Sequence, residues 1–141
     1  MSKKIRVGVI GIGYLGKFHL EKYRLNKSAN LTCLVDVNKK NLNLLDSPMI
    51  FKTKNYKDIR DKVDAVSIVT PTVTHFKIAK YFLENKIHVL LEKPMTETLR
   101  QAKILNNLAK KNKCILQIGH LEQFNPAVKK LRLQLDKPEF I

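Results

Sequence analysis

Three glycines at close spacing follow an apolar run near the N-terminus. The stretch VGVIGIGYLGKFH, residues 7–19, places Gly11, Gly13 and Gly16 in a G-x-G-x-x-G pattern. Between a strand and a helix, the first glycine permits a tight turn, the second lets a ligand approach the backbone, and the third lets the helix pack closely on the sheet. The unpaired N–H groups and the dipole at the start of such a helix favour an anion. The pattern therefore predicts a loop that binds the pyrophosphate of a dinucleotide.

An acidic residue ends the next apolar stretch. Asp36 lies twenty positions after the last of these glycines, in LTCLVDV, residues 31–37. A carboxylate at this point can accept hydrogen bonds from the adenosine ribose hydroxyls and repel a 2′-phosphate, which favours NAD over NADP. Lys39 and Lys40 follow closely, and a lysine there could neutralise a 2′-phosphate, so NADP stays open. The alternative role of Asp36 is to cap a helix beginning near Asn38.

Two later strand ends also carry polar residues. The stretch HVLLE is followed by Lys93 and Pro94, and proline biases the residue before it toward an extended conformation. The Lys93 ammonium can then project over the crevice beyond the strand ends and orient a substrate hydroxyl or share its proton; the alternative is a solvated surface lysine. The stretch TPTVTH ends at His75, which is either a catalyst or a capping and packing residue.

Strand-length apolar runs alternate with helical patterns along the chain. Strands are expected at residues 5–10, 31–37, 63–70, 88–92 and 114–119, with a weaker one at 49–53. Short helices are expected within residues 38–46 and near 55–61. Longer helices are expected after Thr72 and Thr96, which we predict as their N-caps, with apolar residues at helical spacing: Phe76, Ala79 and Leu83, then Ala102, Leu105 and Ala109. The alternation predicts an α/β fold, a right-handed, doubly wound parallel sheet of the Rossmann type.

Size and composition exclude several classes of protein. The chain has 141 residues, which suits one domain without disulfides or metals as staples. No run approaches the roughly 18 apolar residues that cross a bilayer, and the N-terminal apolar stretch lacks a signal-peptide cleavage site. We therefore expect a cytoplasmic chain without a membrane partner. Cys33 and Cys114 are too far apart for a zinc motif and are expected as free thiols in strands, with no metal site.

The chain is strongly basic. Its 27 Lys and Arg against 12 Asp and Glu give a formal net charge of +15. Such a charge could attract nucleic acid. The lysines, however, are scattered along the whole chain, and no recognition motif accompanies them. We therefore expect no nucleic-acid partner.

The order of five segments, VGVIGIGYLGKFH, VDVN, TPTVTHF, HVLLEKP and GHLEQFNPA, resembles the N-terminal half of the Gfo/Idh/MocA oxidoreductases. The resemblance covers nearly the whole chain. It implies that the glycine loop binds NAD(P), and that Lys93 contacts substrate and assists proton transfer while hydride passes to the nicotinamide. The positions that it implies for cofactor binding are Gly11, Ile12, Gly13, Tyr14, Leu15, Gly16, Asp36, Thr70, Pro71, His75, Glu92 and Lys93.

The segment GHLEQFNPAV is similar to family members that oxidise the 3-hydroxyl of a UDP-N-acetylhexosamine. This likeness makes His120 and Asn125 candidates for the substrate side, and a nucleotide sugar the expected substrate. Gln123 departs from the pattern, because arginine is common at its position. A Gly-His turn and an Asn-Pro helix start would suit plain structure equally well.

Family members continue into a second domain that supplies the substrate pocket, and the resemblance implies a homo-oligomer for the full-length protein. We expect residues 1–120 to form the dinucleotide-binding domain and residues 121–141 to begin the link to a substrate domain. The linking helix, with Val128, Leu131 and Leu135 on one side, is expected to pack on the sheet; its alternative is a membrane surface. Two functions stay open: one half of a sugar dehydrogenase, which needs its other half for turnover, or an inactive cofactor-binding or protein-interaction module.

Overall fold

The computed structural model describes residues 4–134 of the chain. The strands are β1 (Ile5–Ile10), β2 (Ala29–Val35), β3 (Phe51–Thr53), β4 (Ala65–Ile68), β5 (His88–Leu91) and β6 (Leu116–Ile118). The α-helices are α1 (Tyr14–Leu25), α2 (Lys39–Leu42), α3 (Thr72–Glu84), α4 (Leu99–Lys111) and α5 (Pro126–Gln134), and two 3-10 helices are η1 (Tyr56–Lys62) and η2 (Leu121–Phe124).

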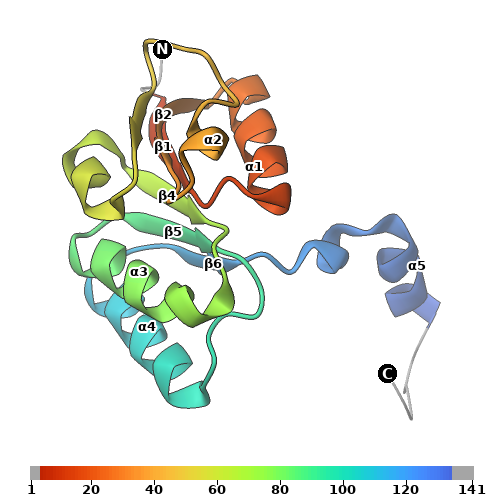
Figure 1. Ribbon diagram of the computed structural model, residues 1–141. Coiled ribbons are helices and arrows are strands. Elements are labelled where there is room, and N and C mark those ends of the chain that lie inside the picture. The colour runs from red at the N-terminus through yellow and green to blue at the C-terminus, as the bar shows by residue number, and fades with distance from the viewer. Residues whose placement is uncertain (1–3, 135–141) are drawn as a thin grey trace.

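The six strands form one parallel sheet in the order β3-β2-β1-β4-β5-β6. The chain winds outward from β1 in one direction and then from β4 in the other, which confirms the predicted doubly wound Rossmann fold. Helices α3 and α4 lie together on one face, and α1 lies on the other (Figure 1). The loops at the carboxyl ends of β1 and β4 meet where the strand order reverses, and ligands bind at this point in such sheets.

Strands β1 and β2 send side chains into two separate cores, because neighbouring side chains of a strand point to opposite faces of the sheet. Val9 belongs to the core beneath α1, whereas the next residue, Ile10, belongs to the core beneath α3 and α4. Burial on both faces explains why the strands read as continuous apolar runs.

Two of the predicted helix starts are wrong. Helix α3 already includes Thr72, and Pro71 precedes it without a side-chain capping bond. Helix α4 begins after Thr98, whose hydroxyl accepts the N–H of Gln101 at 3.3 Å. The hydroxyl of Thr96 instead donates to the carbonyl oxygen of Thr98. Several hydroxyl residues near each start could cap the helix, and the path of the preceding turn decides which one does.

The short elements also differ in detail from the prediction. The helix expected near residues 55–61 is a 3-10 helix, η1. Cys33 is fully buried in β2, as expected, but Cys114 lies just before β6 and is partly exposed. Both are free thiols.

Helix α5 stands away from the sheet, contrary to the prediction that it packs there (Figure 1). Its main contacts are with η2, none of its described residues is buried, and Leu133 is 87% exposed. The cause is the path of the chain, because η2 leads it outward from the end of β6. Leu135, the last residue of the predicted apolar stripe, lies outside the described residues. Within residues 4–134, no helix has the length and hydrophobicity needed to cross a membrane.

Candidate dinucleotide and substrate site

Gly11 and Gly16 shape the loop after β1. Gly11 has a φ angle of +86°, a left-handed conformation that side chains disfavour, and a Cβ there would lie 2.8 Å from the carbonyl oxygen of Val69. A Cβ on Gly16 would lie 1.9 Å from the carbonyl oxygen of Gly11. Gly16 is therefore required first by the close approach of the turn's own backbone, whereas the sequence predicted that it allows the helix to pack on the sheet.

Gly13 faces open space. A Cβ there would meet no protein atom within 4 Å, so nothing in the fold of the described residues demands a glycine. The residue immediately precedes α1, whose first N–H groups have no acceptor within the helix. Tyr14 and Leu15 follow with exposed side chains. An open backbone with unpaired donors at a helix start fits the pyrophosphate of a dinucleotide.

Asp36 ties the glycine loop to the end of β2. Its Oδ2 accepts the N–H of Ile12 at 2.6 Å and a side-chain N–H of Asn41 at 3.0 Å, while Oδ1 accepts the N–H of Asn38 at 2.7 Å. Asp36 is only 8% exposed. It does not cap α2, because the Asn38 side chain does so by accepting the N–H of Lys40. Its carboxylate therefore fixes the loop in addition to any contact with a ribose.

Ile12 contributes to the loop through its backbone and its packing. Its side chain is wholly buried in the core beneath α1, and Asp36 already takes its N–H. A direct contact between the Ile12 side chain and a cofactor would need this packing to open. Its place in the loop is thus to anchor the turn.

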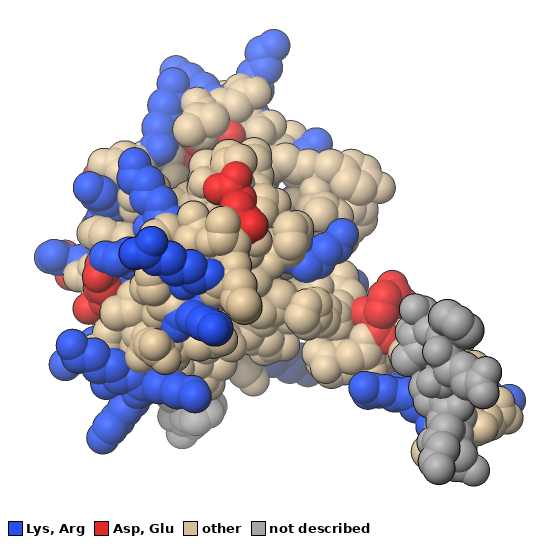
Figure 2. All heavy atoms as spheres, turned by 90° about the horizontal axis from the view of Figure 1, so that it is seen from below, with Lys and Arg blue, Asp and Glu red and all other residues tan. Residues whose placement is uncertain are grey.

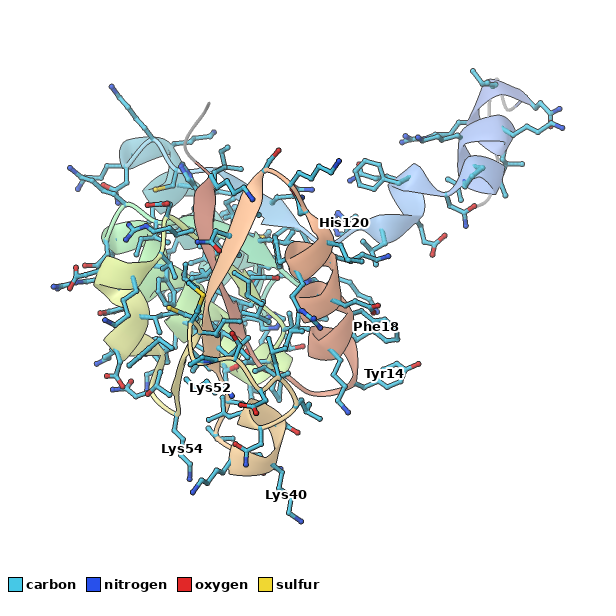
Figure 3. All side chains as sticks on the ribbon, turned by 90° about the horizontal axis from the view of Figure 1, so that it is seen from above. Tyr14, Phe18, Lys40, Lys52, Lys54 and His120 are labelled. Atoms are coloured by element: carbon cyan, nitrogen blue, oxygen red, sulfur yellow. The ribbon has the colours of Figure 1, made fainter. Side chains whose placement is uncertain are left out.

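Lysines surround this end of the molecule. Lys39 and Lys40 are exposed beside Asp36, and Figure 3 shows Lys40 and Lys54 pointing outward at the same end of the molecule, with the partly exposed Lys52 nearby. The face seen from below in Figure 2 also carries many basic side chains and few acidic ones. Such a surface attracts anions in general.

His75 joins the turns that follow β4 and β5. It is 1% exposed, its Nδ1 lies 3.0 Å from the carbonyl oxygen of Pro94, and its Nε2 lies 2.8 Å from that of Thr70. The hydroxyl of Thr70 accepts a bond from Thr74, and Pro71 is exposed. The geometry favours a packing role for His75 over direct catalysis.

Lys93 is exposed at the end of β5, next to a buried glutamate. Its backbone N–H donates to Oε2 of Glu92 at 3.2 Å, and Glu92 is 6% exposed. The other carboxylate oxygen, Oε1, lies 3.1 Å from Nε2 of His19 on α1. Lys93 is thus free to face a ligand, whereas Glu92 faces the protein interior.

His19 and Ser67 were missed by the sequence argument. Nδ1 of His19 lies 2.7 Å from Oγ of Ser67, which is wholly buried in β4. Two signals were available. Ser67 interrupts the apolar run VDAVSIVT, and His19 lies three residues after Gly16, on the side of α1 that faces the sheet.

The two substrate-side candidates lie where the chain leaves the domain. His120 is exposed at the base of the η2–α5 arm (Figure 3). Asn125 accepts the N–H of Ala127 at 3.0 Å and donates to the carboxylate of Glu122 at 2.8 Å, so it forms the start of α5. Within residues 4–134, no group of three or more His, Cys, Asp or Glu side chains is placed to hold a metal ion.

The glycine turn, the buried acidic residue at the end of β2 and the open helix start define a dinucleotide-binding Rossmann domain. The model of the Gfo/Idh/MocA oxidoreductase family, described as an NAD-binding Rossmann fold, matches residues 5–120. The chain belongs to this family, and the predicted resemblance and NAD as cofactor are confirmed.

Curated relatives act on sugars and polyols. The chain is 36% identical over 129 residues to UDP-N-acetylglucosamine 3-dehydrogenase of Acidithiobacillus ferrooxidans, a match that covers 91% of this chain and 41% of that protein. It is 29% identical to scyllo-inositol 2-dehydrogenase (NAD(+)) of Bacillus subtilis, covering 99% of this chain and 42% of the relative. The chain thus spans about two fifths of the length of these relatives.

Solved structures agree on the fold. The crystal form P21 of the Acidithiobacillus ferrooxidans enzyme superposes with a TM-score of 0.84 at 34% identity, covering 94% of this chain and 44% of that one. Scyllo-inositol dehydrogenase from Lactobacillus casei, solved with NAD(H) and scyllo-inositol, gives a TM-score of 0.86 at 22% identity, with 95% of this chain and 41% of that one covered. The second likeness supports the fold alone.

Proposed function

We propose that this chain is the cofactor-binding half of an NAD-dependent dehydrogenase that oxidises a sugar hydroxyl. The observation that carries the proposal is the open backbone at Gly13, beside a loop that Gly11, Gly16 and Asp36 hold in place. A Cβ at Gly13 would contact no atom of the described protein. The glycine is therefore explained by a ligand that approaches the backbone at this position. A bound nicotinamide supplies the hydride acceptor at the carbon being oxidised.

We assign to Lys93 the transfer of the substrate's hydroxyl proton. Its side chain is exposed at the carboxyl edge of the sheet, and its backbone is held by Glu92. As an ammonium, Lys93 orients the substrate oxygen by donating a hydrogen bond; as an amine, it accepts the hydroxyl proton as hydride leaves the same carbon. Because Lys93 is open to solvent, the sugar needs further enclosure from a second domain for efficient turnover.

The substrate that we favour is a UDP-N-acetylhexosamine oxidised at its 3-hydroxyl. The proposal rests on the 36% identity to UDP-N-acetylglucosamine 3-dehydrogenase and on the GHLEQFNPAV segment. Gln123, exposed in η2, stands where arginine is common among such sequences. In the completed protein, Gln123→Arg is expected to leave activity unchanged or raise it.

Calorimetric titration with NADH and NADPH, separately and at moderate salt, tests the cofactor half. We expect saturable 1:1 binding that prefers NADH and is lost in Asp36→Ala. Asp46→Ala is the matched control, because it removes one carboxylate from an exposed site. Failure of the unchanged chain to bind either nucleotide, or equal binding in Asp36→Ala, would contradict the proposal.

The alternative is an inactive cofactor-binding or protein-interaction module. Exposed apolar side chains favour it, because the η2–α5 arm presents Leu121, Phe124, Leu131 and Leu133 at exposures from 52% to 87%. Lys93→Ala separates the two functions. If the dehydrogenase proposal holds, the substitution abolishes NADH formation from NAD and UDP-N-acetylglucosamine in the completed protein, while NADH binding persists. A pure binding module gives no NADH formation before or after the substitution.

A further inference from the structure

A buried polar cluster lies behind the turn that carries Lys93. It consists of His19 on α1, Ser67 on β4 and Glu92 at the end of β5, with Tyr23 of α1 bonded to Ser67. Burial of the Tyr23 hydroxyl raises its pKa. The cluster thus connects one helix and two strands on the side of the sheet that α1 covers.

Hydrogen-bond chemistry fixes the roles within this cluster. With Glu92 ionised, its carboxylate only accepts hydrogen bonds, and Nε2 of His19 then carries the hydrogen that lies between them. In a neutral ring Nδ1 is then an acceptor, and it takes the hydroxyl hydrogen of Ser67 across 2.7 Å. The hydroxyl of Tyr23 can donate in turn to Ser67. Every group therefore has a partner of the right kind, as a buried polar cluster requires.

The arrangement of serine, histidine and carboxylate has the members of a hydrolytic triad. Ser67, however, has no exposed surface, so no substrate carbonyl can reach its Oγ in this fold. The free end of the cluster is Glu92, whose Oε2 accepts the N–H of Lys93. The cluster therefore contacts Lys93 through the backbone N–H of that residue and can fix the position of its backbone.

The Glu92 carboxylate also packs closely against Gly119. A Cβ at Gly119, after β6, would lie 2.7 Å from Oε1 of Glu92. The absence of a side chain at Gly119 leaves room for this carboxylate between β5 and β6. His19 and Gly119 thus restrict the position of the Glu92 carboxylate. In this position, its Oε2 accepts the N–H of Lys93.

We propose that His19 is a positioning residue for Lys93: its Nε2–H orients the Glu92 carboxylate, which in turn holds the backbone N–H of Lys93 and so sets where the Lys93 side chain stands. The role of Lys93 in turnover rests on the proposed function above, whereas the positioning can be measured without it. Loss of the His19 donor would leave Oε1 of this buried carboxylate without a hydrogen-bond donor, and the carboxylate is then expected to move from its place beside the N–H of Lys93.

The test compares two polar substitutions that differ in reach. The amide nitrogen of glutamine extends about as far as Nε2 of histidine, whereas that of asparagine corresponds to Nδ1. Amide hydrogen exchange of Lys93, followed by NMR in the 141-residue chain, is expected to rise about tenfold or more in His19→Asn and His19→Ala. His19→Gln keeps the exchange near that of the unchanged chain.

Two controls separate positioning from loss of stability. Phe18→Ala alters the neighbouring residue on α1, whose ring points outward toward Tyr14, and is expected to leave the Lys93 amide unchanged (Figure 3). Exchange at Val9 in β1 reports global opening. A rise at Lys93 relative to Val9 supports the proposal. Equal exchange at Lys93 in all variants, or a rise shared equally with Val9, overturns it.

A measurement on the unchanged chain covers the case in which the variants fail to fold. The ¹⁵N shifts of the His19 ring report which nitrogen carries hydrogen, and we expect a protonated Nε2 at neutral pH. A bare Nε2 overturns the proposal. NADH calorimetry on the same samples tests cofactor binding separately, so a failure of the proposed function and a failure of the positioning are distinguishable.

Discussion

Each glycine of the loop after β1 serves a different contact at the scale of the single residue. Gly11 adopts a positive φ, Gly16 makes room for the carbonyl oxygen of Gly11, and Gly13 leaves space that no described atom fills. Sequence spacing was enough to predict the loop, because the turn's backbone requires glycine at Gly11 and Gly16 and a close ligand favours it at Gly13. It could not reveal that the carboxylate of Asp36 binds the loop's own N–H at Ile12, since that bond depends on how two strand ends meet.

Alanine at Gly13 and at Gly16 should therefore have different effects. Gly13→Ala is expected to change the free energy of unfolding by no more than about 1 kcal/mol but to weaken NADH binding about tenfold or more, because the methyl group enters the ligand's space. Gly16→Ala should destabilise the fold by about 1–3 kcal/mol or more, because its Cβ collides with backbone. Urea unfolding and calorimetry measure the two effects. Equal losses of stability in both variants would contradict this assignment.

The two thiols should react at different rates. Burial raises the pKa of both Cys33 and Cys114, so little of either is thiolate at neutral pH, and thiolate is the reactive form. We expect the partly exposed Cys114 to react slowly with a thiol reagent, faster as pH rises, and Cys33 only after unfolding. Cys114→Ser and Cys33→Ser assign the two phases. Rapid labelling of Cys33 in the folded chain would show that β2 is more accessible than its burial indicates.

At the scale of the element, the strands were predictable and the helix starts were not. Burial on both faces gives β1 and β2 near-continuous apolar sequences, and this signal can be read without knowledge of the neighbouring elements. A helix start instead depends on the turn before it. Thr96 and Thr98 are equally good capping residues by type, and only the path after Pro94 selects Thr98.

Substitution of the two threonines can check the start of α4. Thr98→Ala is expected to lower the free energy of unfolding by about 0.5–2 kcal/mol, because the N–H of Gln101 loses its acceptor. Thr72→Ala is the matched control on α3, where Thr72 already lies inside the helix and makes no capping bond, and a smaller loss is expected. Denaturant unfolding measures both. A larger loss at Thr72 would place the cap of α3 there after all.

At the scale of the whole molecule, the chain divides into a layered domain and an arm. The sheet and its helices enclose both cores, whereas η2 and α5 contribute no buried residue. The amphipathic pattern of α5 correctly indicated a helix but not its partner, because a pattern shows which side is apolar and not what covers it. The family match ends at residue 120, where the arm begins.

Removal of residues 121–141 is therefore expected to leave the domain intact. Within residues 121–134, η2 and α5 pack mainly on each other, so the shortened chain should lose less than about 1 kcal/mol, with a Tm within about 4 °C of the full chain. NADH affinity should stay within about twofold, because the glycine loop and Asp36 lie in the part that remains. Thermal unfolding and calorimetry on the two chains measure this. A larger fall in Tm would mean that the arm folds back onto the domain in solution, and weaker NADH binding at unchanged Tm would place part of the arm beside the cofactor.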